Sequence, residues 1–464
     1  SQMADTMEAE RKARPPVPPV LARPSVVSLA LSECCEVEAE QELLLLEDVM
    51  TKLTAVGSYI LGAKDGTEEL DDEGRRILTF DYRHSERPTL RRADSACMHD
   101  QLEFIQSMGL APELMDSWGF NPLALDKVRC RAACAFLLGP QGHAVRPDPG
   151  QLQSFLGAVE ASYDSGAAYH SWFHAVDVTH CVYRLLRLFR CSLYLSSLER
   201  FALLVSATAH DAGHPGLSNA FLVETSHELA LRYHDISPLE NYSCCRLFEI
   251  LASPRNNILA TLGRGQFREV RKVCVESILH TDNGLHRGLV KEVEIFHELH
   301  PAVQEAHQFH AVEPQEFPSQ EALACYQTLE ARQMFCRLLL HVCDLSNATK
   351  PFHICRLWAQ RILDEFFAEG DAELAAGLPV QSLHDRTKAV LEYTQIGFAE
   401  FLVAPLALAV ARALPPFAAS AERLLENARC WQALWVETSE PRAQEREAVE
   451  ARLQRLERRF IENG

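Results

Sequence analysis

The sequence predicts an all-α domain, and three observations support this prediction. From about residue 97 to residue 440, apolar residues recur at the three- and four-residue spacing of buried helix faces. Alternation of apolar and polar residues over the length of a strand is rare, and no repeat of 20–50 residues is found. Turn signals such as Ser253-Pro254, Gly263-Arg264-Gly265 and Gly377-Leu378-Pro379 separate the helical stretches. We therefore expect one compact, multi-helix domain.

The chain divides into three parts by composition. Residues 1 to about 30 are rich in Pro, Ala and Arg and are expected to be disordered, residues 36–62 resemble an acidic amphipathic helix, and residues 65–94 are charged like a linker. We predict a regulatory or linker segment over residues 1–96 and a folded domain over residues 97–440. A charged helical tail, or a coiled-coil contact, is predicted over residues 441–464.

Individual helices can be placed within the folded domain. Ser196-Ser197-Leu198-Glu199 predicts a capping box that opens a helix reaching His210, and Gly213 and Pro215 are expected to stop it. Further helices are predicted over residues 221–234, 240–252, 266–281, 321–343, 353–369, 384–413 and 418–434.

Charge and cysteine content exclude some classes of protein. The net charge of −19 would repel the phosphates of a nucleic acid, so no nucleic-acid partner is expected. The 15 cysteines are scattered and include no CxxC pair, which favours free thiols in a reducing compartment and a cytoplasmic location. The apolar stretch from Phe401 to Leu414 is interrupted by Pro405 and Arg412. It predicts a buried helix, so no membrane span is expected.

Two histidine pairs at helical spacing predict a metal site. His170, His174 and Asp177 stand at i, i+4 and i+7, so on a helix they project from one face. His210 and His214 repeat the four-residue spacing. Imidazole and carboxylate groups together suit Zn²⁺ and similar divalent cations.

Two aspartates complete the predicted ligand set. Asp211 adjoins His210, and Asp344 lies in His341-Val342-Cys343-Asp344-Leu345-Ser346-Asn347. A lone histidine pair is more often a core or surface feature, but three such pieces far apart in one chain favour a metal site. We therefore predict His174, His210, Asp211 and Asp344 as metal ligands.

A second group of histidines competes with this prediction. His297, His300, His307 and His310 lie in a stretch rich in Glu and Pro, without carboxylates at helical spacing around them. We expect this stretch to be an exposed, solvated loop.

Six motifs carry a resemblance to a known family. They are Tyr169-His170-x-x-x-His174-Ala175-x-Asp177-Val178, His210-Asp211-x-x-His214-Pro215-Gly216, Leu239-Glu240-Asn241, Thr281-Asp282, Asp344-Leu345-Ser346-Asn347 and Gln395-Ile396-Gly397-Phe398. In this order they resemble the catalytic domain of the class I 3′,5′-cyclic nucleotide phosphodiesterases, which are HD-type metal phosphohydrolases. The stretches 228–241 and 377–386 are most similar to the cGMP-specific ninth family.

The resemblance implies a reaction and two metal ions. The predicted ligands would hold one ion, usually zinc, and Asp211 would bridge to a second, magnesium or manganese. A hydroxide shared by the two would attack phosphorus. His170 would protonate the leaving 3′ oxygen, Glu240 would orient that imidazole, and His214 would hydrogen-bond near the phosphate. The substrate would be a small-molecule cyclic nucleotide, cGMP first and cAMP second, and hydrolysis would end its signal. Both a monomer and a homodimer remain open.

The resemblance also implies the residues that bind the nucleotide. Gln395 would hydrogen-bond the edge of the base, Phe398 would stack on its ring, and Ile362 would form the opposite apolar wall. Tyr169 and Asn347 are the remaining substrate-binding candidates.

Several positions depart from the family pattern. Ser171 replaces an asparagine, Gly213 an acidic residue, Tyr242-Ser243 a His-His pair, His234 an asparagine and Asn283 a methionine. These changes leave two alternatives open beside the phosphodiesterase. One is a catalytically weak cyclic-nucleotide sensor, and the other is a broader HD nucleotide phosphohydrolase.

Overall fold

The computed structural model describes residues 103–139, 145–163, 166–312 and 317–463. Every regular element in these ranges is a helix, which confirms the predicted all-α fold class. The predicted segment 1–96, with its expected helix over residues 36–62, lies outside the described residues.

The helices run through the whole of the described chain. The α-helices are α5 (Pro112–Met115), α6 (Lys127–Leu137), α7 (Pro149–Ser162), α8 (Trp172–Leu188), α9 (Ser197–Ala209), α10 (Asn219–Glu224), α11 (Glu228–Arg232), α12 (Pro238–Ala252), α13 (Arg264–Leu279), α14 (His286–Leu299), α15 (Pro301–Val312), α16 (Gln320–Tyr326), α17 (Leu329–Asp344), α18 (Phe352–Ala375), α19 (Leu391–Phe398), α20 (Ala404–Ala413), α21 (Ala418–Ser439) and α22 (Ala443–Asn463). Short 3₁₀ turns join them, among them η1 (Pro122–Ala124), η2 (Cys191–Leu193), η3 (Asn283–Leu285), η4 (Ser346–Thr349) and η6 (Pro415–Phe417), and η5 (Ala399–Val403) is a π-helical turn.

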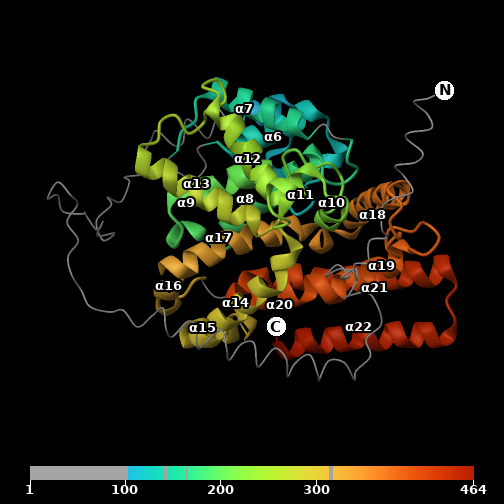
Figure 1. Ribbon diagram of the computed structural model, residues 1–464. Helices are drawn as coiled ribbons and strands as arrows, with labels where there is room; N and C mark the ends of the chain where they lie inside the picture. Colours follow the sequence, from blue (N-terminus) through green and yellow to red (C-terminus); the bar gives the residue numbers. More distant parts are fainter. Residues whose placement is uncertain (1–102, 140–144, 164–165, 313–316, 464) are drawn as a thin grey trace, which may run out of the picture.

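The helices form two layers with α17 and α18 between them (Figure 1). In the layer of α6 to α13, α8 packs on α6 and α9, and α9 packs on α13. In the other layer, α14 packs on α20, α20 on α21 and α21 on α22. Helix α17 contacts α8, α9, α13 and α14, so it joins the two layers. The last turn of α17 is buried from Leu340 to Cys343, and Asp344 at its end is partly exposed.

Large aromatic side chains fill the interior. Trp172, Trp358 and Trp431 are almost completely buried, and they come from α8, α18 and α21. Each buried aromatic side chain removes a large apolar area from water, which favours the folded state by about 1.5–3 kcal/mol. Trp172 and Trp431 belong to the main core, whereas Trp358 packs with Tyr169 and Ile354 in a smaller apolar cluster.

Several predicted helices are found where the sequence placed them. The Ser196 side chain accepts a hydrogen bond from the Glu199 amide (3.1 Å), and the Glu199 carboxylate accepts one from the Ser196 amide (2.6 Å). This confirms the capping box at the start of α9, whose end leads into the His210 segment. The predictions over 240–252, 266–281, 353–369 and 418–434 correspond to α12, α13, α18 and α21.

Three predicted helices are wrong in length because local turns interrupt the apolar pattern. Residues 221–234 form α10 and α11, separated at Ser226, whose φ is 50°. Residues 321–343 form α16 and α17, because the Thr328 hydroxyl caps the second helix by accepting from the Ala331 amide (3.2 Å). The helix predicted from residue 384 begins at Leu391 instead, after a turn in which Asp385 accepts from the Thr387 amide (2.9 Å).

The histidine-rich stretch is helical, so the predicted exposed loop is wrong. His297 lies on α14, and His307 and His310 lie on α15. Pro301 occupies the first turn of α15, where a missing amide hydrogen costs nothing, so the proline begins this helix. The side chains of His297, His300 and His307 are half-buried, and none of the three belongs to a group of potential metal ligands among the described residues.

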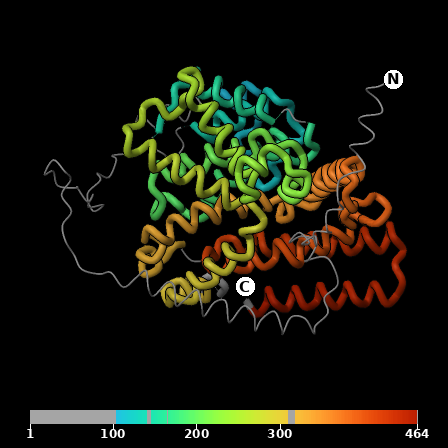
Figure 2. The backbone as a smooth tube through the Cα atoms, viewed as in Figure 1, coloured from blue at the N-terminus to red at the C-terminus, as the bar shows by residue number. Residues whose placement is uncertain are grey.

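The C-terminal residues form a helix that folds back on the domain. Helices α21 and α22 run side by side in opposite directions (Figure 2). The Arg429 guanidinium bridges Glu450 (2.7 Å) and Glu457 (2.6 Å) across this pair. Arg452 of α22 also pairs with Glu400 of η5 (2.7 Å), so α22 packs against the turn that follows Phe398.

One stretch among the described residues is long and apolar enough to cross a membrane. It runs from Leu391 to Ala413, through α19, η5 and α20, and 67% of its most apolar window is buried inside the protein. This burial agrees with the buried helix that the sequence predicted for the apolar stretch from Phe401 to Leu414.

Candidate metal-dependent active site

Four side chains on or directly after three helices come together, and two of them, Asp211 and Asp344, are partly exposed. His174 lies on α8, His210 and Asp211 follow α9, and Asp344 ends α17. Their potential ligand atoms all lie within 4.8 Å of one another. The two histidines are each 1% exposed. All four predicted metal ligands are thus brought together.

The distances show one common centre. Asp344 Oδ1 lies 2.9 Å from His174 Nε2 and 3.3 Å from His210 Nε2. Asp211 Oδ2 lies 3.0 Å from His210 Nε2 and 3.7 Å from His174 Nε2. The two imidazole nitrogens and the two carboxylate oxygens therefore face one point.

Hydrogen bonding around His210 makes this group fit a metal ion. His210 Nδ1 contacts the Ala207 carbonyl oxygen at 2.9 Å, and a carbonyl can only accept, so Nδ1 carries a proton. The buried atoms His210 Nε2 and Asp211 Oδ2 lie 3.0 Å apart, but among the described residues neither makes a hydrogen bond of suitable geometry. A divalent cation would satisfy both atoms at once, and an imidazole whose other nitrogen donates to a carbonyl is a typical metal ligand.

His170 lies beside this group and is held by a carboxylate. Its Nδ1 contacts Glu365 Oε1, and its amide donates to Glu365 Oε2 (3.1 Å). The Tyr169 amide donates to the same oxygen (2.7 Å). Burial lowers the pKa of His170, but the charge and hydrogen bond of Glu365 outweigh it and raise this pKa to about 9. The His170 ring is therefore protonated at neutral pH.

The carboxylate that contacts His170 is not the predicted one. The family resemblance implied Glu240 for this contact, whereas in the structure both Glu240 oxygens accept from Asn219 Nδ2 (2.9 and 3.2 Å). Burial first, and then the charge of Asp282, raise the pKa of Glu240 to about 8. Glu365 lies in the helix predicted over residues 353–369. Nothing in the sequence around it distinguishes a glutamate that faces a buried histidine from one that faces solvent.

His214 stacks on His170 with ring centroids 4.0 Å apart. Burial, followed by the charge of His170, lowers the pKa of His214 to about 3, so its ring is neutral. Its Nδ1 accepts from the Gly216 amide (3.0 Å), which leaves the proton on Nε2. Two neighbouring imidazoles are therefore proton donors, and only His170 is charged.

Asp177 shares the helix face of His174 but does not join the metal group. Its Oδ1 pairs with Lys350 Nζ, and both side chains are almost fully buried. Sequence spacing placed Asp177 on the correct face, but only the fold shows that Lys350, far along the chain, neutralises it.

The five predicted substrate-binding residues lie on several elements. Tyr169 accepts a hydrogen bond from Asn347 Nδ2 through its hydroxyl and packs with Trp358 in a small apolar cluster that Ile362 borders. Gln395 is buried on α19, and Phe398, at the end of that helix, is half-buried against the main core. The contacts within the structure do not assign a role to these residues, so their roles remain proposals.

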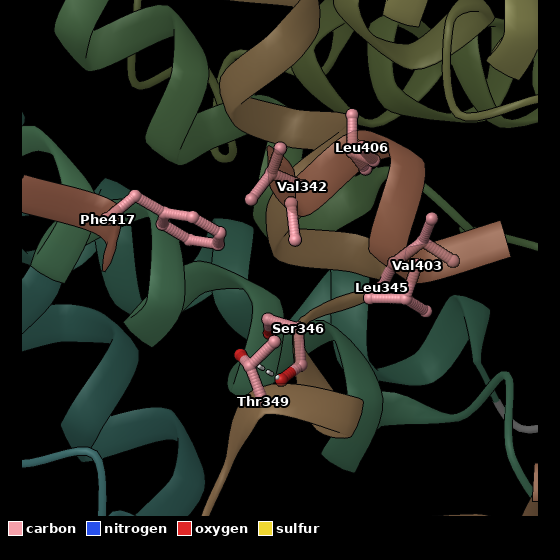
Figure 3. A pocket seen from close by; sticks show the side chains of 8 residues that line it. Val342, Leu345, Ser346, Thr349, Val403, Leu406 and Phe417 are labelled. Carbon is pink, nitrogen blue, oxygen red and sulfur yellow. Dashed lines mark hydrogen bonds between the residues drawn. The ribbon is translucent and has the colours of Figure 1, made fainter. Parts of the chain in front are cut away.

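An apolar pocket lies beside the end of α17 (Figure 3). It is lined by Val342, Leu345, Ser346, Thr349, Val403, Leu406, Ala407 and Phe417. The Thr349 hydroxyl donates to the Ser346 carbonyl oxygen (2.9 Å) and the Ser346 hydroxyl donates to the Cys343 carbonyl oxygen (2.6 Å), so both polar lining side chains already have partners within the fold. Without a charged side chain, this pocket does not suit a nucleotide phosphate.

Two departures from the family pattern contact each other. Gly213 has a φ of +87°, and a Cβ at this position would lie 2.6 Å from Cε1 of Tyr242. The Tyr242 side chain therefore occupies the space that a side chain at position 213 would need. The two changes are structurally matched.

We expect Gly213→Ala to lower the free energy of unfolding by about 1–3 kcal/mol, because alanine at positive φ is strained and its Cβ collides with Tyr242. Denaturant unfolding monitored by circular dichroism measures this change. Gly157→Ala on α7 is the matched control, since a Cβ there meets nothing within 4 Å, and it should stabilise the protein by about 0.5–1 kcal/mol. Equal stabilities of the Gly213 variant and the wild type would show that position 213 tolerates a side chain.

The fold and the site define an all-α protein with a buried His–Asp metal group beside a carboxylate-held histidine. The family model of the 3′5′-cyclic nucleotide phosphodiesterases matches residues 169–424. This match includes every residue of the metal group together with His170 and Glu365. The chain belongs to the 3′5′-cyclic nucleotide phosphodiesterase family.

Relatives of known identity agree with this assignment. The chain is 34% identical over 283 residues to the 3′,5′-cyclic-nucleotide phosphodiesterase regA of Dictyostelium discoideum, covering 61% of this chain and 33% of that protein. It is 32% identical over 292 residues to the 3′,5′-cyclic-AMP phosphodiesterase 4C of Rattus norvegicus, covering 63% of this chain and 52% of that protein. The matched region thus spans a third to about half of these relatives.

A solved structure has the same fold. The crystal structure of the phosphodiesterase domain of the rhodopsin phosphodiesterase from Salpingoeca rosetta matches with a TM-score of 0.61 and 26% identity. The match covers 72% of this chain and 96% of that one.

Proposed function

We propose that this chain hydrolyses a 3′,5′-cyclic nucleotide to the 5′-monophosphate. The observation that carries this proposal is the convergence of two imidazoles and two carboxylates on one point, where the buried atoms His210 Nε2 and Asp211 Oδ2 face each other without a hydrogen bond, next to His170, whose pKa is raised to about 9. His174, His210, Asp211 and Asp344 would hold a first divalent cation, Zn²⁺, and Asp211 would reach a second, Mg²⁺ or Mn²⁺. Such ions, when bound, lower the pKa of water and neutralise charge on phosphoryl oxygens.

The residues beside the metal group supply the protons. His170 would donate its Nε2 proton to the 3′ oxygen as the bond between phosphorus and that oxygen breaks. Glu365 would keep His170 charged until the proton leaves and would hold its ring in place. His214, which is neutral with its proton on Nε2, would donate a hydrogen bond to a phosphoryl oxygen without repelling His170 further.

The base would bind on the side of α18 and α19. We propose that Gln395 contacts the base edge, that Phe398 and Ile362 enclose the ring, and that Tyr169 and Asn347 border the sugar and phosphate. The Gln395 amide has no hydrogen-bond partner among the described residues, so it can present either its oxygen or its nitrogen. That freedom is compatible with both cGMP and cAMP. We keep cGMP as the first candidate because residues 228–241 and 377–386 resemble the cGMP-specific ninth family, and cAMP, the substrate in the name of the rat relative, as the second. The described cysteines are all unpaired, which supports the proposed cytoplasmic location.

Hydrolysis of cGMP and cAMP, measured side by side with Mg²⁺ or Mn²⁺ and after chelation, tests the proposal. We expect metal-dependent release of the 5′-monophosphate, and loss of this activity in Asp344→Ala. A nucleoside mono- and triphosphate panel distinguishes a broader phosphohydrolase. If calorimetry shows that a cyclic nucleotide binds but no turnover is measured, the proposed enzymatic activity is wrong and a cyclic-nucleotide sensor is favoured.

A further inference from the structure

Helix α18 carries three buried carboxylates on one face. Glu365, Glu369 and Glu373 follow one another at four-residue spacing, so they project in the same direction. Glu365 contacts His170 in the candidate active site. The other two carboxylates face a different partner, His384, in the turn region between α18 and α19.

The group formed by Glu369, Glu373 and His384 has the geometry of a metal site. The potential ligand atoms of the three side chains lie within 4.8 Å of one another. Glu373 Oε1 lies 3.1 Å from His384 Nδ1. The three residues are 3%, 3% and 7% exposed, so this is not a cluster of acidic groups on the surface.

The backbone holds the histidine against the helix. Gly370 lies between the two glutamates, and a Cβ at this position would come within 2.3 Å of the His384 carbonyl oxygen. Only glycine allows this approach. The His384 ring also packs on Phe366, with ring centroids 5.3 Å apart. The three potential ligands are therefore fixed in position before any ion binds, which reduces the cost of binding.

The charges of the group are not balanced by the protein. Glu369 accepts hydrogen bonds from the Ser218 amide (2.8 Å) and hydroxyl (2.5 Å). Glu373 accepts from the Gln381 amide (3.1 Å) and side chain (3.1 Å) as well as from His384. Among the described residues, no lysine or arginine side chain bonds to either carboxylate, so two buried negative charges face one imidazole.

A buried carboxylate is costly unless it is paired or coordinates a metal ion. A single Glu373–His384 ion pair would leave Glu369 without a cationic partner. Burial, opposed by the Ser218 hydrogen bond, raises the pKa of Glu369, which means that its charged form is disfavoured there unless a cation is bound. A divalent cation bound by both carboxylates would neutralise them, and His384 would bind the ion through a ring nitrogen that carries no proton.

We propose that Glu369, Glu373 and His384 bind a divalent cation outside the active site. One imidazole nitrogen and two carboxylates suit Zn²⁺ or Mn²⁺, with solvent completing the coordination. The ion would tie α18 to the residues before α19, and Ser218 is linked to the site through its hydrogen bonds to Glu369. We assign it a structural role, because none of its three ligands belongs to the group of His174, His210, Asp211 and Asp344 in the candidate active site.

The proposal can be tested by counting bound ions in the full chain. Zinc or manganese is added in equilibrium dialysis, and the bound equivalents are measured by mass spectrometry. Glu373→Gln and His384→Gln keep similar size and hydrogen-bonding groups, and each should bind one equivalent less than the wild type. Asp371→Asn, on the same helix but exposed, is the matched control and should bind as the wild type does. Equal counts in all four proteins would overturn the site.

Two further measurements separate this site from the active site. Asp344→Ala removes a ligand of the His174 group but leaves α18 unchanged, so this variant should still bind the ion that His384→Gln loses. An anomalous difference map of wild-type crystals grown with Zn²⁺ should show a peak between Glu369, Glu373 and His384. If the variants do not fold, the test rests on this map of the wild type. The absence of a peak between the three side chains would overturn the proposal.

Discussion

Replacing His170 with alanine should lower kcat for cyclic nucleotide hydrolysis by about 10²- to 10⁴-fold, which is the usual contribution of a general acid. The ring lies beside the metal group, and Glu365 keeps it protonated by raising its pKa to about 9. Without the imidazole, the 3′ oxygen would leave without a proton from the protein. Metal content should stay unchanged, because His170 is not one of the four residues around the common centre.

The role of His170 can also be tested by the pH dependence of kcat/KM in a variant of its partner, Glu365. Glu365→Gln removes the charge that raises the pKa of His170, so burial then dominates and this pKa falls. Since the protonated ring is the active form, the alkaline limb of the kcat/KM profile should move to lower pH. Activity at neutral pH should fall by about 10- to 100-fold.

A neighbouring residue provides the control for this experiment. Asp364→Asn changes an exposed carboxylate of the same helix and should leave the pH profile unchanged. An unchanged alkaline limb in Glu365→Gln would show that His170 does not supply the proton.

Replacing Lys350 with methionine should lower the free energy of unfolding by about 3–5 kcal/mol. Lys350 Nζ pairs with Asp177, and their side chains are 0% and 3% exposed. Removing the ammonium group leaves a buried carboxylate without a counter-charge, and its desolvation is no longer compensated. Denaturant unfolding monitored by circular dichroism measures the loss.

Two variants show whether the cause is the buried charge. Lys350→Met combined with Asp177→Leu removes both charges and should recover part of the stability, because no unpaired charge remains. Lys272→Met breaks an exposed pair with Glu276 and should cost only about 0–1 kcal/mol. A Lys350 variant as stable as Lys272→Met would mean that the Asp177 pair contributes little.

The chemistry of the metal site could be predicted from the sequence because its ligands lie in short motifs of metal-binding residue types that resemble those of a known family. Helical spacing alone was not enough, since His174 and His210 join the metal group but His170, His214 and Asp177 do not. Each short motif contains histidine or aspartate, the residue types that bind divalent cations. The motifs supply His174, His210, Asp211 and Asp344. The capping box at Ser196 was predictable for the same reason, since both partners lie within one helical turn. Local rules suffice where the interacting groups are close in the chain.

The partners of these residues were decided by tertiary structure. Glu365, not Glu240, contacts His170, and Lys350 neutralises Asp177, although about 170 to 200 residues separate the members of each pair, as their positions show. A glutamate in a helix looks the same in sequence whether it faces water or a buried histidine. Only the packing of α18 against the other helices turns its row of glutamates inward, and that packing depends on apolar contacts made by the whole chain.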